Sequence, residues 1–289
     1  MLNKQYEIQD NTPDCIDWEN YKEQILKNYY DLLSNKQNNE NVFQKFFEEN
    51  PSFVPGAFEI FGESGHYPFM ETIISQPDIG TIFQRKPDFV WLAQDSLTFS
   101  PVFVEIEKPS KKMFNKNKTT TADFNQALNQ IHQWKYILDN PTNVQVLKDY
   151  FSLPTYIRDK VFKPQFLLIY GRREEYQNDN LLTGIRAEHK TDNIDIISFD
   201  RLEPSYKCQQ IISCKISQGN YNVINIPPTY RYRPDIAEDL AKLHGFKDKI
   251  NDMKYTSEER KNFLKERYQY WYDFGKSNPK GILDPKDNE

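Results

Sequence analysis

Cysteine is scarce in this chain, and long hydrophobic runs are missing. The 289 residues include three cysteines (Cys15, Cys208 and Cys214), with no CxxC pair and no histidines at metal-ligand spacing. A disulfide framework or a zinc site is therefore not expected. No apolar run approaches the ~18 residues that a membrane-spanning helix needs, and the first residues lack the apolar core of a signal peptide. We expect a soluble protein of the reducing cytoplasm, without a membrane partner.

An excess of positive charge is also missing. The 37 lysines and arginines are outnumbered by 42 acidic residues, which gives a net charge of −5. A protein that coats nucleic acid by bulk electrostatics is therefore disfavoured, although an enzyme with a local basic patch is not. Five lysines do cluster in one short stretch: Lys108, Lys111, Lys112, Lys116 and Lys118. Such a run is most often a solvated loop, but this one follows three acidic residues, which favours a contact with phosphate.

The hydrophobic patterning predicts an α/β fold with a mixed central sheet. Segment 56–84 contains several turn signals and receives no assignment. We divide the chain into a leader with one helix (1–39), a central domain (40–202) and a mainly helical C-terminal extension (203–289). The predicted helices cover 17–34, 40–49, 122–138, 174–188, 234–244 and about 256–275, and the predicted strands cover 89–92, 102–107, 165–170, 194–199 and 224–228.

Two of the predicted strands carry carboxylates where a purely structural strand would not. Side chains alternate along a strand, so Glu105 and Glu107 share one face, while Val102, Val104 and Ile106 point to the other. Asp88 opens the preceding strand and would lie beside them if the two strands pair. Exposed strands often carry acids, but these are embedded in strongly apolar sequence. Three converging carboxylates repel one another unless a cation, typically a divalent metal with oxygen ligands, lies between them.

This arrangement could hydrolyse a phosphodiester bond. Asp88, Glu105 and the backbone carbonyl of Ile106 could hold Mg²⁺ or Mn²⁺, and Glu107 is a further candidate ligand. Glu107 or Lys108 could then orient the attacking water. These residues make the carboxylate cluster the candidate catalytic centre.

The predicted helix 122–138 carries two glutamines one turn apart, Gln126 and Gln130, and Trp134 follows a further turn on. A glutamine pair near a carboxylate cluster can hydrogen-bond a metal-bound water or a phosphate, although simple exposure is the plainer explanation. Trp134 is expected to pack in the core.

These motifs together resemble the PD-(D/E)xK nuclease superfamily, in which Pro87-Asp88 and Glu105-Ile106-Glu107 would be the two half-motifs. Residues 104–112 (VEIEKPSKK), followed by Ala127, Gln130 and Trp134, more closely resemble the nuclease domain of Shedu-type anti-phage defence proteins, over about residues 40–202. The resemblance implies a restriction endonuclease-like mixed central sheet flanked by helices, with an added C-terminal helical segment. It also implies a Mg²⁺- or Mn²⁺-dependent DNA endonuclease or nickase that acts in bacterial defence on double-stranded DNA or DNA with free ends, and that assembles as a homo-oligomer.

One position departs from the superfamily pattern, because Glu107 stands where the motif has a lysine and Lys108 is displaced by one residue. We expect Glu107 to serve as ligand or base, Lys108 to contact phosphate and Gln130 to position water. Further DNA contacts are expected from Lys111, Lys112, Lys116, Lys118 and Gln126. Two alternatives stay open: a catalytically inactive nucleic-acid-binding or sensor protein on the same fold, and a C-terminal Tyr/Trp helix that serves for oligomerisation.

Overall fold

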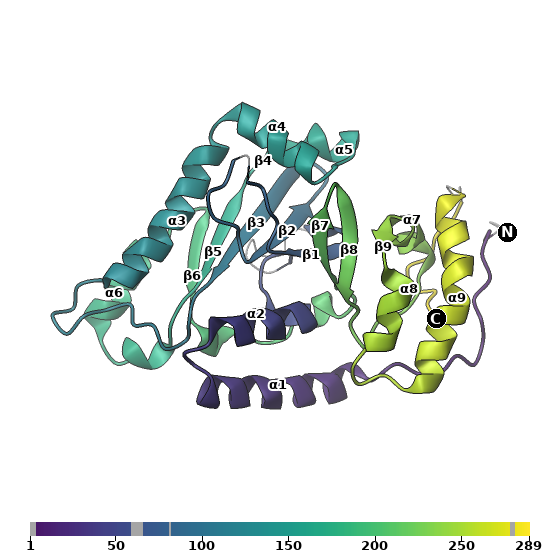
Figure 1. Cartoon of the computed structure of the whole chain (residues 1–289), viewed down its shortest axis with the longest axis horizontal. Coiled ribbons are helices and arrows are strands. Elements are labelled where there is room, and N and C mark those ends of the chain that lie inside the picture. The colour runs from purple at the N-terminus through teal and green to yellow at the C-terminus, as the bar shows by residue number, and fades with distance from the viewer. Residues whose placement is uncertain (1–3, 59–65, 81, 278–280) are drawn as a thin grey trace.

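A mixed β-sheet runs through the centre of the protein (Figure 1). The structure is a computed structural model that describes residues 4–58, 66–80, 82–277 and 281–289. Within these residues the sheet has nine strands in the order β6-β5-β3-β2-β1-β7-β8-β9, with β4 paired to β3. The predicted α/β class is thus confirmed. The strands are β1 (Tyr67–Ser75), β2 (Phe89–Gln94), β3 (Thr98–Ile106), β4 (Val161–Phe162), β5 (Gln165–Ile169), β6 (Ile194–Ile197), β7 (Ile212–Ser217), β8 (Asn220–Asn225) and β9 (Leu243–His244).

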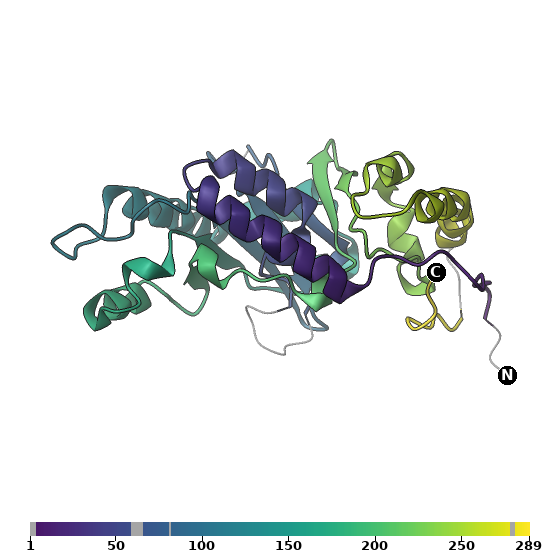
Figure 2. The same cartoon turned by 90° about the horizontal axis from the view of Figure 1, so that it is seen from below.

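Helices cover both faces of the sheet (Figures 1 and 2). On one face α1 (Trp18–Asn35) and α2 (Glu40–Glu49) pack on Val102 and Val104 of β3, as the predicted side-chain alternation requires. On the other face α3 (Ala122–Leu138) and α4 (Pro141–Tyr150) pack on Phe103. The remaining helices are α5 (Thr155–Arg158), α6 (Asn180–Glu188), α7 (Ala237–Leu240), α8 (Phe246–Lys249) and α9 (Glu258–Lys276). Among the described residues, no helix combines the length and apolar character needed to cross a membrane.

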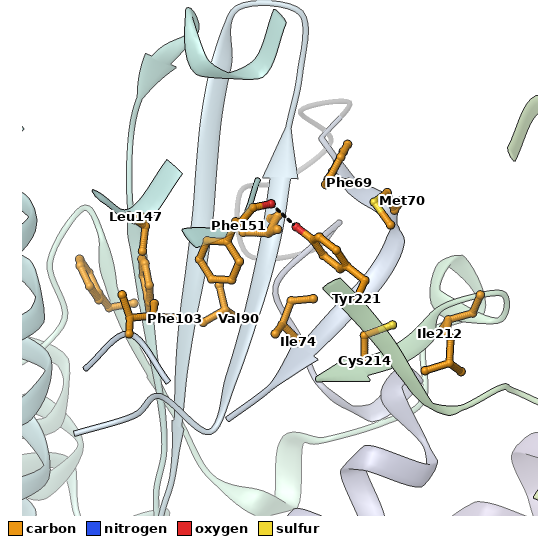
Figure 3. Packing of buried hydrophobic residues seen from close by; sticks show 14 of the residues in the cluster. Phe69, Met70, Ile74, Val90, Phe103, Leu147, Phe151, Ile212, Cys214 and Tyr221 are labelled. Carbon is orange, nitrogen blue, oxygen red and sulfur yellow. Dashed lines mark hydrogen bonds between the residues drawn. The ribbon is translucent and has the colours of Figure 1, made fainter. Parts of the chain in front are cut away.

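The core under α4 is built from large apolar side chains of neighbouring strands (Figure 3). Phe103 and Val90 lie there with Phe151, which follows α4, and all three are essentially inaccessible to solvent. Tyr221 of β8 reaches into the same region and donates a hydrogen bond of 2.7 Å to the Phe151 carbonyl. The buried hydroxyl is therefore satisfied, and β8 is tied to the helical layer over the sheet.

The C-terminal part of the chain adds strands to the central sheet as well as helices. Strands β7 and β8 extend the central sheet beyond β1, and α7, α8 and α9 pack beside them (Figure 1). Residues 4–16 are irregular, as expected, and run along this region, where the Tyr6 hydroxyl donates a 2.5 Å hydrogen bond to Asp287. The buried carboxylate of Glu289 accepts hydrogen bonds from Arg267 Nε at 2.7 Å and Trp271 Nε1 at 3.0 Å. Both ends of the described chain are thus anchored on α9.

The structure confirms the strongly periodic elements and corrects several weaker ones. The predicted helices 17–34, 40–49 and 122–138 correspond to α1, α2 and α3. The expected helix 174–188 begins only at Asn180, because the Asp179 side chain caps its first turn, and a 3₁₀ turn (Arg173–Glu175) precedes it. The expected helix 234–244 is broken into a 3₁₀ turn (Pro234–Ile236), α7 and β9. Ser257, rather than Thr256, caps α9.

Strand boundaries differ more from the sequence prediction. The strand expected at 194–199 ends at Ile197 and is followed by a 3₁₀ turn (Phe199–Arg201), and the strand expected at 224–228 is β8, which ends at Asn225. Sequence periodicity missed β1, β4, β7, β9, α4, α5 and α8. In β1 the cause is a bulge: Met70 and Glu71 have φ of 58° and 49°, and the pairing with β2 shifts between Pro68 and Ile73. The remaining 3₁₀ turns are Pro51–Phe53, Tyr206–Cys208 and Ile250–Asp252.

The outer edge of β6 is capped by side chains. The carboxylate of Asp195 accepts a 2.7 Å hydrogen bond from the backbone N–H of Ile196, and the Arg186 guanidinium donates to the Ile196 carbonyl. Arg186 is held in turn over the ring of Tyr176, 4.9 Å from its centroid. The Ile196 groups that point away from β5 are thereby satisfied within the chain.

Gly275 allows α9 to pack directly on α7. A β-carbon at this position would overlap the carbonyl oxygen of Ala237. We expect Gly275→Ala to lower the free energy of unfolding by about 2 kcal/mol, because the backbone of α7 must move away. Gly184→Ala in α6 is the matched control: its β-carbon meets nothing within 4 Å, so it should raise stability by about 0.5–1 kcal/mol. Urea unfolding measures the change in the free energy of unfolding for both variants. Equal changes for Gly275→Ala and Gly184→Ala would contradict the close packing of α9 on α7.

Candidate active site

Asp88, directly before β2, lies beside Glu105 near the end of β3. The strands pair antiparallel with Phe89 opposite Val104, and the Asp88 N–H donates to the Val104 carbonyl at 3.0 Å. The Asp88 carboxylate turns toward β3 and accepts a 2.7 Å hydrogen bond from the N–H of Ile106. The pairing that the sequence analysis required is thus present.

The environment of the two carboxylates disfavours their charge. Burial raises the pKa of Asp88 to about 7, with further contributions from Glu40 and Glu107, although the hydrogen bond from the Ile106 N–H opposes the rise. Burial also raises the pKa of Glu105 well above its ordinary value, and the charges of Asp88, Glu107 and Glu40 act in the same direction. Such a pair favours either protonation or neutralisation by a cation.

Helix α3 supplies the side chain that contacts Glu105. Gln130 is buried, with 6% of its surface exposed, and its Nε2 donates to Glu105 Oε1 at 2.8 Å. The Gln130 Oε1 accepts a 3.0 Å hydrogen bond from Arg85. Within the described part of the chain, the other carboxylate oxygen of Glu105, Oε2, is buried and has no hydrogen-bond partner. Trp134 packs in the core, as expected, and Gln126 is exposed on α3.

Glu107 follows the last residue of β3 and is paired with a lysine. A turn closed by a 3.0 Å hydrogen bond from the Lys111 N–H to the Lys108 carbonyl reverses the chain, and Lys111 Nζ lies 2.5 Å from Glu107 Oε2. The lysine nearest to Glu107 is therefore Lys111 and not the adjacent Lys108. The charge of Lys108 acts instead on Glu40, where it opposes the rise in pKa that burial and Glu107 cause.

The other candidate DNA contacts are spread along the loop before α3. Lys118 forms an ion pair of 2.7 Å with Asp179, the cap of α6, whereas the side chains of Lys112 and Lys116 are exposed. The Lys112 carbonyl accepts a 3.4 Å hydrogen bond from Tyr170, which follows β5. Only Lys111 of this loop is brought to the carboxylates by an ion pair.

Three neighbours of the acidic pair were missed by the sequence analysis: Glu40, Gln76 and Arg85. Glu40 is the first residue of α2, and its pKa is raised by burial and by Glu107. The Gln76 side chain hydrogen-bonds Asp88. Arg85 lies just before the Pro87-Asp88 motif, which was the one local signal that could have drawn attention to it. The other two depend on how α2 and the end of β1 pack on the sheet.

Among the residues that the structure describes, carboxylate, histidine and cysteine side chains do not gather into a larger cluster. Across the described ranges of the chain, no group of three or more of these side chains is arranged to hold a metal ion. A cation at this position would therefore rest on Asp88, Glu105 and backbone or solvent oxygens, while Glu107 faces Lys111.

The comparison with known families covers the part of the chain that holds these residues. A family model described as Shedu protein SduA, C-terminal, matches residues 37–202. This range includes Glu40, the β2–β3 pair and the glutamine of α3. No curated protein matches the chain. Since the family model covers more than half of the sequence, the chain belongs to the Shedu SduA C-terminal family, a membership that suggests a role in anti-phage defence.

Proposed function

We propose that this protein is a metal-dependent DNA endonuclease or nickase that acts in bacterial anti-phage defence. The observation that carries the proposal is the opposed pair of Asp88 and Glu105, whose pKa values are both raised and whose Glu105 Oε2 has no hydrogen-bond partner. Two partly buried carboxylates side by side without a compensating charge are costly, and a divalent cation removes that cost. The PD-(D/E)xK resemblance of the motifs supports the same reaction class.

The donor set fits Mg²⁺ or Mn²⁺. Asp88, Glu105 and the Ile106 carbonyl would hold the ion, and the unpartnered Oε2 of Glu105 supplies an acceptor that the chain leaves unsatisfied. Magnesium sites commonly use one or two carboxylates and leave the other positions to water and substrate phosphate. When bound, such an ion polarises the scissile phosphate and lowers the pKa of a coordinated water.

The chain itself would supply the proton acceptor and the positive charge beside the phosphate. Glu107 lies two residues after Glu105 and would accept the proton of the attacking water. Lys111 Nζ, 2.5 Å from Glu107 Oε2, would supply an ammonium group beside the acidic residues, a role that the motif lysine would otherwise have. Lys108, together with the exposed Lys112 and Lys116, would contact the DNA backbone.

The test uses the purified full chain with supercoiled plasmid and linear duplex DNA. We expect nicking or cutting with Mg²⁺ or Mn²⁺ and none with a chelator. Asp88→Ala should lose this activity, while Asp31→Ala on the exposed face of α1 should retain it. DNA that stays intact with both metals over a range of pH and salt would contradict the proposal.

One observation favours a second function, a nucleic-acid-binding or sensor protein without catalysis. No group of three acidic, histidine or cysteine side chains among the described residues is arranged for a metal. Titration of the protein with Mn²⁺ by calorimetry separates the two functions. Saturable binding that Asp88→Asn removes supports the enzyme, whereas DNA binding with no metal binding supports the second function.

A further inference from the structure

Arg85 begins a chain of hydrogen bonds that ends at the acidic pair. Its NH1 donates to Gln130 Oε1 at 3.0 Å, and Gln130 Nε2 donates to Glu105 Oε1 at 2.8 Å. The two ends of a glutamine amide differ, because the oxygen only accepts and the nitrogen only donates. A guanidinium can only donate, so Arg85 draws the amide oxygen toward itself and directs the amide nitrogen to Glu105.

The orientation of the amide determines what Glu105 can do. With the nitrogen toward it, Glu105 uses Oε1 for Gln130 and keeps Oε2 free of any partner in the described chain. With the amide reversed, two acceptor oxygens would face each other, and the carboxylate would have to turn away or take up a proton. The fixed amide therefore presents Glu105 as a carboxylate with one available oxygen.

Helix α3 carries Gln130 and also fixes the backbone of Arg85. Trp134, one turn after Gln130, is 2% exposed, and its Nε1 donates to the backbone carbonyl of Arg85 at 3.2 Å. The backbone of Arg85 is thus fixed by the same helix that presents Gln130. The Arg85 residue itself is exposed, so its side chain can be shortened or exchanged without opening the core.

We propose that Arg85 is a positioning residue for the acidic pair, which orients the Gln130 amide so that Glu105 keeps one oxygen available for a divalent cation. The proposal rests on the metal-dependent function above and adds a residue that contacts neither the cation nor the reacting phosphate. For the replacement of Arg85 by a neutral residue, the proposal predicts a change in cation affinity opposite in sign to the one that charge alone predicts. Removal of a positive charge near a cation site should by itself strengthen cation binding, whereas loss of the positioning contact should weaken it.

The experiment measures Mn²⁺ binding to the full chain by calorimetry, without DNA. Arg85→Met is expected to bind Mn²⁺ about 10–100-fold more weakly, and Arg85→Lys, which keeps a donor, should recover most of the affinity. Gln130→Leu should cause a similar loss, and the double variant should be no weaker than Gln130→Leu alone, because both changes remove one chain of contacts. Lys86→Met is the matched control, since Lys86 pairs with Asp78 at 2.6 Å and should report only the loss of charge.

The possible results separate this proposal from the function on which it rests. If Arg85→Met binds Mn²⁺ as tightly as the wild type or more tightly, the positioning role alone is overturned. The same holds if the losses of Mn²⁺ affinity in Arg85→Met and Gln130→Leu add up in the double variant. A wild-type chain that binds no Mn²⁺ would contradict the proposed function and the positioning role together. Urea unfolding of each variant verifies that the loss of binding is not a loss of fold.

Discussion

Glu105→Gln is expected to reduce metal-dependent DNA cleavage by at least about 100-fold, because changes to outer-shell partners of metal ligands already cost about 10–100-fold and Glu105 is the proposed direct ligand. The substitution keeps the size of the side chain and removes its charge. Its amide oxygen can still accept the hydrogen bond that Gln130 Nε2 donates to Glu105 Oε1 in the structure, so the loss of cleavage should report the missing charge. Single-turnover cleavage of plasmid DNA with saturating Mn²⁺ measures the effect.

Two further glutamate variants make this result specific. Glu23→Gln on the exposed face of α1 carries the same chemical change and should cleave like the wild type. Glu107→Gln tests the neighbouring acid, and a loss of cleavage with intact Mn²⁺ binding would assign Glu107 to proton transfer. Cleavage retained in Glu105→Gln would remove Glu105 from the site, and the proposed metal ligands with it.

Asp88→Asn is expected to change the pH dependence of stability in the absence of divalent cations. Burial raises the pKa of Asp88 from 3.8 to about 7 in the folded chain. The stability associated with protonated Asp88 is therefore fully present below about pH 4 and is lost as the pH rises through about 7, and the raised pKa of Glu105 acts in the same direction. At pH 8 the neutral asparagine should be more stable than the wild type by on the order of 4 kcal/mol, at about 1.4 kcal/mol per unit of pKa.

At each pH the difference in the free energy of unfolding between Asp88→Asn and the wild type cancels the contributions of the other titrating groups. Urea unfolding in the presence of a chelator should give similar free energies for both proteins near pH 4 and a growing advantage for Asp88→Asn toward pH 8. Added Mn²⁺ should then stabilise the wild type and leave the variant unchanged. Parallel pH profiles for the two proteins would show that Asp88 does not carry an unfavourable buried charge. Asp31→Asn, on the exposed face of α1, provides the baseline.

The sequence was sufficient where the pattern is local. Period-two alternation predicted which residues of β3 share a face, because it follows from backbone geometry alone, and the expected burial of Trp134 on α3 was also correct. The bulge of β1 could not be predicted in this way, since the positive φ of Met70 and Glu71 interrupts the alternation of side chains between the two faces of the sheet. The short strands β4 and β9 are set by their neighbours rather than by their own residues.

In the candidate site too, local sequence patterns indicate some contacts, and the packing of distant elements determines the others. Asp88 and Glu105 are adjacent because two consecutive strands pair, which the sequence indicates. Glu40 reaches them only through the packing of α2 on the sheet, and Arg85, although close to Asp88 in sequence, is connected to Glu105 only through Gln130 of α3; sequence spacing carries no information on that packing. The ion pair of Glu107 with Lys111 depends on the turn closed by the hydrogen bond from the Lys111 N–H to the Lys108 carbonyl, and sequence spacing does not indicate that turn.

The capped edge of β6 restricts how copies of this chain can assemble. A second molecule that added a strand there would first have to displace Asp195 from the Ile196 N–H and Arg186 from the Ile196 carbonyl. A continuous intermolecular sheet through β6 would thus exchange hydrogen bonds already made for new ones, with little net gain. If the expected homo-oligomer forms, its subunits should not be joined by a sheet that continues from β6 of one copy into the next.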